Sequence, residues 1–154
     1  QQLSIERHQA QAYIDAYFSR YPNVLSYMEK TRECAAEQGY VETIMGRRLL
    51  LPNITSKNAI LRKAAERQAI NAPLQGSAAE IIKLAMIALA PWQAESKGAA
   101  KMLMQVHDEL VFSIDGAFLH EAIPVIRDRM ENVLALSVPL VVQVGQGKNW
   151  DEAH

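Results

Sequence analysis

Apolar side chains recur every three or four positions over residues 5–20 and again over residues 22–37. This spacing places them on one face of a helix, so it predicts two helices. Pro22 suits the first turn of the second helix, because its missing N–H group would have no partner there. Gly39 suits the end of that helix, where a left-handed residue is common.

Two hairpins are predicted from short runs of strand-forming residues. The runs 40–44 and 48–51 flank Met45-Gly46, and glycine is typical of such a turn. The runs 102–106 and 110–114 flank His107-Asp108-Glu109 instead. This second connection is unusual, since two apolar strands normally meet through Asn-Gly or Asp-Gly.

Two further helices are expected between these hairpins. The first should run from about 56 to 71 and be disturbed by Pro73, because proline removes a backbone donor and crowds the preceding turn. Ser77 and Glu80 match a capping box, which predicts the start of another helix over about 77–94. This helix is apolar almost all round, so we expect it to be buried.

The C-terminal third has the pattern strand, strand, helix, strand. The helix is expected over about 117–135, and residues 139–144 form an apolar run typical of a final strand. The predicted fold class is therefore α+β. It has a helical N-terminal part with a β-hairpin, then an antiparallel ββαβ sheet packed on helices.

Composition agrees with a globular protein. The chain has 154 residues, 49% hydrophobic and 21% charged, and this length suggests one domain or a piece of a larger one. The single cysteine, Cys34, excludes an internal disulfide and fits a reducing cytosol. The longest apolar stretch, 81–92, carries Lys83 and is too short to span a bilayer, so we expect no membrane partner.

The net charge of −1 conceals a division along the chain. Residues 45–75 hold six basic residues and one acidic residue, whereas residues 105–154 hold three basic and eight acidic residues. Such a division hints at a polyanion site together with a metal site. Two solvated faces of opposite sign would give the same division.

His107, Asp108 and Glu109 form the sharpest chemical feature of the sequence. Charged groups between apolar strands need a partner, and a divalent cation is one. Magnesium binds oxygen ligands and often uses only one or two carboxylates together with substrate phosphates. A solvated acidic turn explains the triplet as well, so the residues alone leave both interpretations open.

A second candidate site is a stripe of polar residues at every fourth position: Lys63, Arg67, Asn71 and Gln75. On a continuous helix these side chains share one slowly drifting face. Lysine and arginine suit phosphates, and asparagine and glutamine suit base edges, so the stripe fits a nucleic acid. An exposed helix face without a ligand explains the same spacing.

Four segments, taken together, resemble the bacterial DNA polymerases of family A. They follow the family's order and spacing and account for essentially the whole chain: 39–48, 65–83, 105–110 and 144–151. The segment Gln105-Val106-His107-Asp108-Glu109-Leu110 is similar to the third polymerase motif of that family. The resemblance implies a C-terminal fingers and palm fragment. Residues 1–55 would belong to fingers-type helices and a hairpin, and residues 56–154 to the palm, whose sheet is ββαβ.

The resemblance implies a DNA-directed DNA polymerase, which transfers a nucleotide from a dNTP to a primer 3′-hydroxyl group with two magnesium ions. Asp108 matches the family's metal-binding aspartate and Glu109 the neighbouring carboxylate, so both are expected to be catalytic metal ligands. His107 matches a residue near the primer terminus. The other expected contacts with primer–template DNA are Arg67, Asn71, Gln75, Gln105 and, from the polar stripe, Lys63.

The family's first carboxylate motif and its nucleotide-holding helix have no counterpart in these 154 residues. The resemblance therefore implies that the chain does not polymerise alone. Its expected partners are the upstream portion of the same polymerase, primer–template DNA and dNTP. The implied location is the bacterial cytoplasm, in association with the nucleoid.

Two other classes of protein fit parts of the sequence. A ββαβ module could bind nucleic acid without chemistry, as RNA-recognition folds do. Those folds display aromatic residues on their strands, and the hairpin strands at 102–106 and 110–114 offer only Phe112. Another palm-type nucleotidyl transferase, such as a nucleotide cyclase or a single-subunit RNA polymerase, would share the sheet. A cyclase needs no duplex contacts, so the polar stripe disfavours it.

Overall fold

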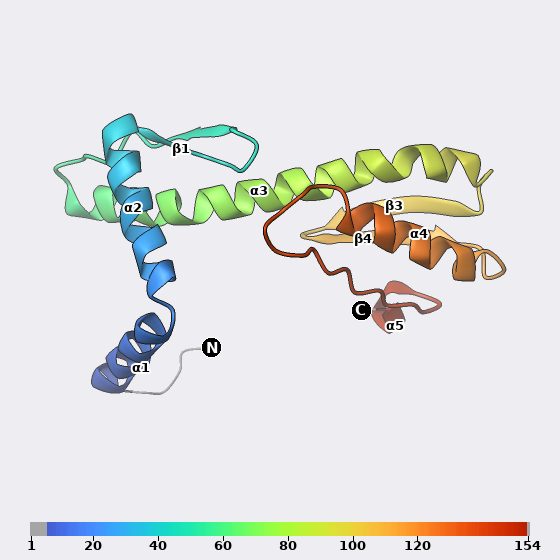
Figure 1. Ribbon diagram of the computed structural model, residues 1–154, viewed down its shortest axis with the longest axis horizontal. Coiled ribbons are helices and arrows are strands. Elements are labelled where there is room, and N and C mark those ends of the chain that lie inside the picture. Colours follow the sequence, from blue (N-terminus) through green and yellow to red (C-terminus); the bar gives the residue numbers. More distant parts are fainter. Residues whose placement is uncertain (1–5, 154) are drawn as a thin grey trace. The chain divides into compact units, whose positions relative to one another are not determined.

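The computed structural model describes residues 6–153 (Figure 1). The chain divides into two compact units, one ending at Gln75 and the other starting at Gly76. Each unit packs a two-stranded antiparallel hairpin against one half of the long helix α3 (Ala59–Glu95). This mixture of helices with small antiparallel sheets confirms the predicted α+β class.

The first unit opens with the helices α1 (Arg7–Arg20) and α2 (Pro22–Gln38). Both match predicted helices, and residue 5 of the first prediction lies outside the described residues. Pro22 is the first residue of α2, as its fixed φ angle favours. Gly39 ends the helix in the left-handed conformation, with φ of 79°, and its N–H group donates to the carbonyl oxygen of Ala35 at 2.8 Å.

The first hairpin pairs β1 (Tyr40–Glu42) with β2 (Arg48–Leu50), and Tyr40 lies opposite Leu50. Gly46 lies in the connection with φ of 80°, a conformation that glycine adopts without a steric penalty. The hairpin, α2 and the N-terminal half of α3 enclose a small core. Its buried members are Ala35, Val41, Leu51, Ile54, Ala65 and Ala69.

The predicted break at Pro73 is wrong, because α3 is a single helix of 37 residues. An interior proline costs a helix about 3 kcal/mol. Buried contacts offset this cost on both sides of it, at Ala69 and Ile70 before it and at Ile82 after it. The predicted start at 77 is wrong for the same reason, since the capping-box residues lie inside the helix.

Only one face of the C-terminal half of α3 is buried, which corrects the expectation of all-round burial. Leu89 is fully buried, whereas Ile87 is 68% exposed. Because α3 is longer than predicted, it also has the length and the apolar window, of mean hydropathy 1.2, that a membrane-spanning helix would need. Only 22% of that window is buried, and its buried face packs in the core of the second unit, as in an amphipathic helix of a globular unit.

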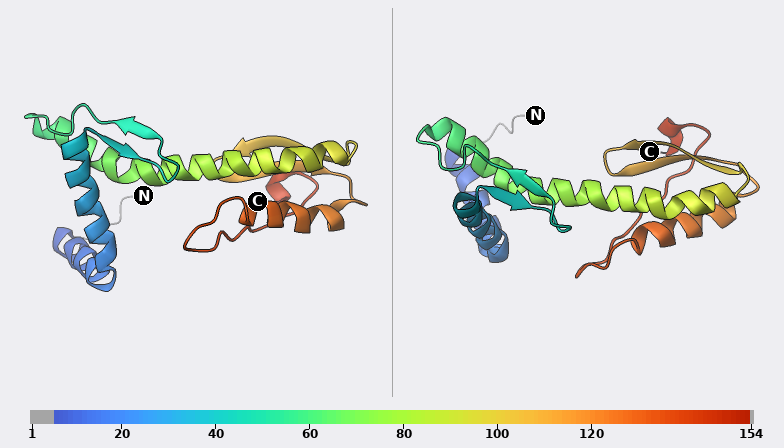
Figure 2. Two further views of the ribbon diagram at one scale, coloured as in Figure 1. Left: turned by 45° about the horizontal axis from the view of Figure 1, so that its top comes forward. Right: turned by 90° about the horizontal axis from the view of Figure 1, so that it is seen from above.

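In the second unit, β3 (Ala100–Val106) pairs with β4 (Glu109–Ile114), and α4 (Leu119–Glu131) follows. The C-terminal half of α3, this hairpin and α4 lie side by side around a second core (Figure 2). Trp92 of α3 stacks on Phe118, with ring centroids 6.1 Å apart. The buried members of this core are Leu89, Trp92, Ala100, Ala122 and Ile126.

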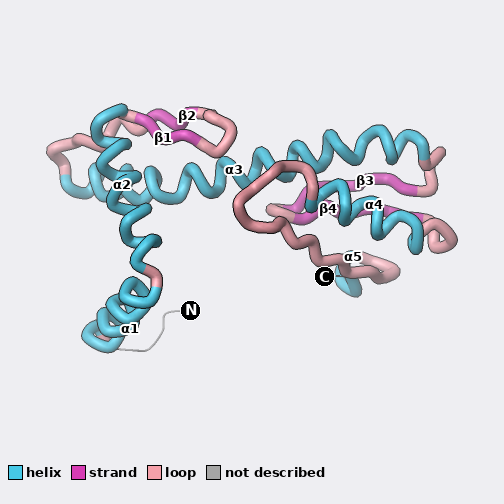
Figure 3. Tube along the Cα trace, viewed as in Figure 1, coloured by secondary structure: helices cyan, strands magenta, loops and turns pink. Residues whose placement is uncertain are grey.

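The predicted final strand over 139–144 is wrong. These residues belong to a long loop that precedes the short helix α5 (Trp150–Ala153) (Figure 3). A strand needs a partner for its backbone groups, but the N–H group of Val142 donates to the Glu131 carboxylate at 2.9 Å. Among the described residues, the second unit's sheet therefore has two strands instead of the expected three.

Candidate functional site

The turn between β3 and β4 carries the residues of the predicted metal site. His107 and Asp108 form the turn, and Val106 lies opposite Glu109 at its base. His107 adopts a left-handed conformation with φ of 52°, which costs a residue with a side chain about 1–2 kcal/mol. The Gln105 amide donates to the carbonyl oxygen of His107 at 2.9 Å and so braces the turn.

The two carboxylates of this turn fit part of a magnesium site. Asp108 is exposed, and no hydrogen bond or ion pair engages its carboxylate within residues 6–153. Glu109 is half-buried as the first residue of β4. The described residues contain no cluster of three potential ligands. Magnesium commonly takes one or two protein carboxylates plus water and phosphate oxygens, so Asp108 and Glu109 suit a shared site rather than an all-protein cage.

The predicted polar stripe lies on the exposed side of the N-terminal half of α3. All four members, Lys63, Arg67, Asn71 and Gln75, are exposed. Their side chains make no hydrogen bond or ion pair among the described residues. Ala65 and Ala69 are two positions away from Arg67, which on a helix is almost the opposite side, and both are buried. The stripe thus faces away from the core with its polar atoms available to a ligand.

The predicted site residues therefore form two sets. One set gathers at the turn end of the second hairpin: Gln105, His107, Asp108 and Glu109. The other set is the stripe, on the part of α3 that belongs to the first unit. Their roles toward metal and DNA stay predictions. Gln105 was predicted to contact DNA, and in the structure its amide nitrogen donates to the His107 carbonyl oxygen inside the turn.

Arg48, a basic residue beside the turn of the first hairpin, contacts side chains of its own hairpin. The Arg48 guanidinium binds the Glu42 carboxylate at 2.7 Å and lies over the Tyr40 ring, 4.4 Å from its centroid. The hydrogen bond to the Glu42 carboxylate raises the already high pKa of Arg48. Arg48 therefore stays cationic but holds its own hairpin together.

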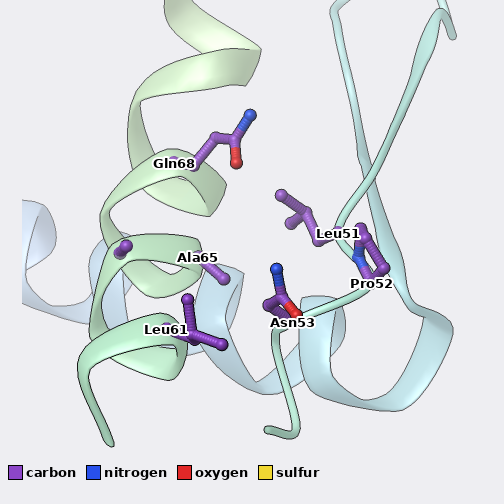
Figure 4. A pocket seen from close by; sticks show the side chains of 7 residues that line it. Leu51, Pro52, Asn53, Leu61, Ala65 and Gln68 are labelled. Atoms are coloured by element: carbon purple, nitrogen blue, oxygen red, sulfur yellow. The ribbon is translucent and has the colours of Figure 1, made fainter. Parts of the chain in front are cut away.

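A small cavity of about 100 Å³ lies in the first unit, between the end of the first hairpin and α3 (Figure 4). Leu51, Leu61 and Ala65 line its apolar part, and the amides of Asn53 and Gln68 are its polar groups. This volume holds a few water molecules and is too small for a nucleotide. We therefore assign no chemistry to it.

Sequence reasoning missed two residues that anchor the first part of β3, the strand that leads to this turn. Gln93, near the C-terminal end of α3, accepts a hydrogen bond from the N–H group of Met102 at 2.7 Å. Ser96 accepts one from the N–H group of Ala100 at 3.1 Å. A glutamine and a serine near a helix end give no spacing signal, so only the packing of helix on strand reveals these contacts.

Comparisons with known proteins agree with the motifs. A model of the family described as DNA polymerase family A matches residues 1–152. The DNA polymerase I of Pseudomonas aeruginosa is 57% identical over 153 residues, which cover 99% of this chain and 17% of the relative. The thermostable DNA polymerase I of Thermus filiformis is 43% identical over 153 residues, covering 99% of this chain and 18% of the relative.

Solved structures also match, and one of them shows the likeness over nearly the whole chain. It is described as the POL domain of Pol1 from M. smegmatis in complex with DNA primer-template and dNTP. The match has a TM-score of 0.93 and 41% sequence identity, and it covers 99% of this chain and 27% of that chain. The chain spans less than a fifth of the length of the two curated relatives. Since the family model covers nearly every residue, the chain belongs to DNA polymerase family A.

Proposed function

We propose that the chain is the C-terminal fingers and palm part of a template-directed DNA polymerase. The observation that carries this proposal is the exposed Asp108 carboxylate, which lies beside Glu109 in a tight turn and has no partner within residues 6–153. A carboxylate held this way on a rigid hairpin suits a metal ion shared with a substrate phosphate. Residues 1–55 would belong to the fingers and residues 56–154 to the palm.

The turn residues would act on the primer terminus and the dNTP. Two bound magnesium ions would supply activation of the primer 3′-hydroxyl group and stabilisation of the leaving pyrophosphate. Asp108 would hold metal directly, and Glu109 would support it from the base of the turn. His107 would lie near the primer terminus, held by the bond from Gln105 to its carbonyl oxygen.

The polar stripe would hold the primer–template duplex. Lys63 and Arg67 would contact phosphates, and Asn71 and Gln75 would contact base edges or sugars. Their exposure, and the absence of internal partners among the described residues, supports this role. The stripe also favours polymerase chemistry over a cyclase, which needs no duplex contacts.

The remaining partners follow from the family. The expected second metal-binding carboxylate and the nucleotide-holding helix would come from the upstream portion of the same polymerase. The isolated chain would therefore bind magnesium weakly and would not extend a primer. The complete enzyme would act in the bacterial cytoplasm, at the nucleoid.

A chimera tests the proposal. In a complete family A polymerase, this chain replaces the corresponding residues, and primer extension is measured with magnesium. We expect extension by the chimera and none by the chimera carrying Asp108→Asn, with DNA affinity equal in both. The proposal is wrong if Asp108→Asn extends primers at a near-normal rate. It is also wrong if chimeras made in two different family A hosts both fold and bind DNA but do not extend primers.

A further inference from the structure

The outer edge of β3 carries hydrogen bonds that the proposed chemistry does not explain. One edge of this strand pairs with β4. On the other edge, the Ala100 N–H group donates to Ser96, just after α3, and the Met102 N–H group donates to Gln93, in the last turn of α3. N–H groups two residues apart point to the same side of a strand. The helix end thus takes the place of a neighbouring strand for the first residues of β3.

The pairing of β3 with β4 shifts by one residue directly after this anchored stretch. Met102 lies opposite Phe112, but Met104 lies opposite Val111, so Leu103 is an extra residue in β3. This is a β-bulge, a feature that bends a strand and re-aims the side chains beyond it. The last anchored residue, Met102, is therefore the residue immediately before the bulge.

The bulge determines which residues form the turn. With it, Val106 lies opposite Glu109, and only His107 and Asp108 remain between the strands. If pairing continued from Met102 without a shift, Gln105 would lie opposite Glu109 and Val106 would join a three-residue loop. Such a slip also moves each β3 side chain after Met102 to the other face of the hairpin. Gln105 would then leave the face that it now shares with Leu110.

We propose that Gln93 is a positioning residue for the metal-binding turn. Its side-chain oxygen holds the Met102 N–H group outward at 2.7 Å and so keeps the bulge at Leu103. The bulge in turn presents Asp108 in a two-residue turn with Glu109 at its base. This inference rests on the proposed role of Asp108 as a metal ligand. Gln93 itself touches neither metal nor substrate.

Three variants of the chimera test this role. Gln93→Leu removes the acceptor, and Gln93→Glu retains an oxygen with the same reach. Gln143→Leu is the matched control, because Gln143 is exposed in the C-terminal loop and makes no side-chain hydrogen bond among the described residues. The measurements are amide hydrogen exchange of peptides that cover β3, the magnesium concentration for half-maximal extension, and primer–template affinity.

We expect Gln93→Leu to speed exchange in β3 and to raise the magnesium requirement by about tenfold, the usual effect of losing a residue that orients a metal ligand. Its DNA affinity should stay unchanged. Gln93→Glu and Gln143→Leu should match the unmodified chimera in all three measurements. Faster exchange with an unchanged magnesium requirement would overturn the proposal, and so would unchanged exchange.

A folding defect does not leave the question open. If Gln93→Leu does not fold, Gln93→Asn keeps the amide but shortens its reach by one methylene group. A folded Gln93→Asn variant with a normal magnesium requirement also defeats the proposal. Failure of the proposed function has a different signature, since extension would then persist in Asp108→Asn whatever residue occupies position 93.

Discussion

Each unit pairs a two-stranded hairpin with one half of α3, but the candidate functional residues lie on different elements. In the first unit the helix carries them, as the polar stripe, and the Glu42–Arg48 contact occupies the hairpin. In the second unit the hairpin carries Asp108, and the helix supports it through Gln93. Under the proposed function, the same pair of elements would offer a binding surface on the helix in one unit and a reactive turn on the hairpin in the other.

The two turns show what this difference requires of the sequence. Both hairpins place one residue at positive φ, Gly46 with 80° and His107 with 52°. Glycine adopts this conformation without a steric penalty, and histidine does not. Strained residues of this kind concentrate at functional sites, where the surrounding structure compensates for them. The strain at His107 therefore agrees with the proposed role of its side chain, whereas Gly46 has no such role.

The largest expected difference between the two hairpins appears when one carboxylate is removed from each. Asp108→Asn in the chimera should abolish detectable primer extension, a loss of at least about a thousandfold, since it removes charge that would stabilise metal at the reacting phosphate. Glu42→Gln removes an exposed carboxylate whose partner is Arg48 and should leave extension nearly unchanged. Single-turnover extension rates measure both. Equal losses would show that the hairpins do not differ in function.

Local signals in the sequence predicted the elements whose ends are set locally. Pro22 and Gly39 are the terminal signals of α2, and both act as predicted. The two hairpins were predicted from their strand runs and turns. His-Asp-Glu stood out as a poor turn sequence, but the residues alone left a solvated turn equally open. The role of Asp108 as a metal ligand came from the family resemblance and stays a prediction. The stripe was found because its spacing of four residues matches a helix.

Tertiary contacts decided the features that the sequence could not predict. The signals at Pro73 and Ser77 favour a break, but burial of Ala69 and Ile82 on either side keeps α3 continuous. The apolar run at 139–144 has strand-like composition, but Glu131 takes one of its backbone donors. Gln93 had no signal, because its bond to Met102 exists only after helix and strand have packed together.

A cavity-creating substitution in the core of one unit should destabilise that unit and leave the other unit unchanged. Leu51 and Leu89 are the largest fully buried side chains of their respective units. Each change to alanine should cost about 2–5 kcal/mol of local stability. Leu89→Ala should speed amide exchange in β3, β4 and α4 and lower extension. Leu51→Ala should speed exchange in α2 and the first hairpin and weaken DNA binding. Exchange that rises throughout the chain in either variant would mean that the units unfold together.

Basic residues on the two halves of α3 should differ in their effect on DNA. Arg67→Ala should weaken primer–template binding and lower the slope of log K against log salt by about one unit, the expected effect of one lost phosphate contact. Lys83 is exposed on the other half of the same helix but lies outside the stripe, so Lys83→Ala is the matched control. Affinities measured at several salt concentrations give both slopes. A slope that Arg67→Ala leaves unchanged would place DNA elsewhere.

The smallest expected effects come from adding a side chain at the positive-φ residue of the first turn and removing it at that of the second turn. A Cβ atom at Gly46 would meet no heavy atom within 4 Å, so Gly46→Ala should cost only the positive φ, about 1 kcal/mol of hairpin stability, and leave extension unchanged. His107→Gly removes the steric cost and should raise hairpin stability by up to about 1 kcal/mol. It also removes the side chain that we propose lies near the primer terminus, so extension should fall. Amide exchange in each hairpin reports the stability, and single-turnover extension reports the activity. If His107→Gly gains stability without losing activity, the strain at this turn serves no chemical purpose, and the contrast between the two hairpins rests on Asp108 alone.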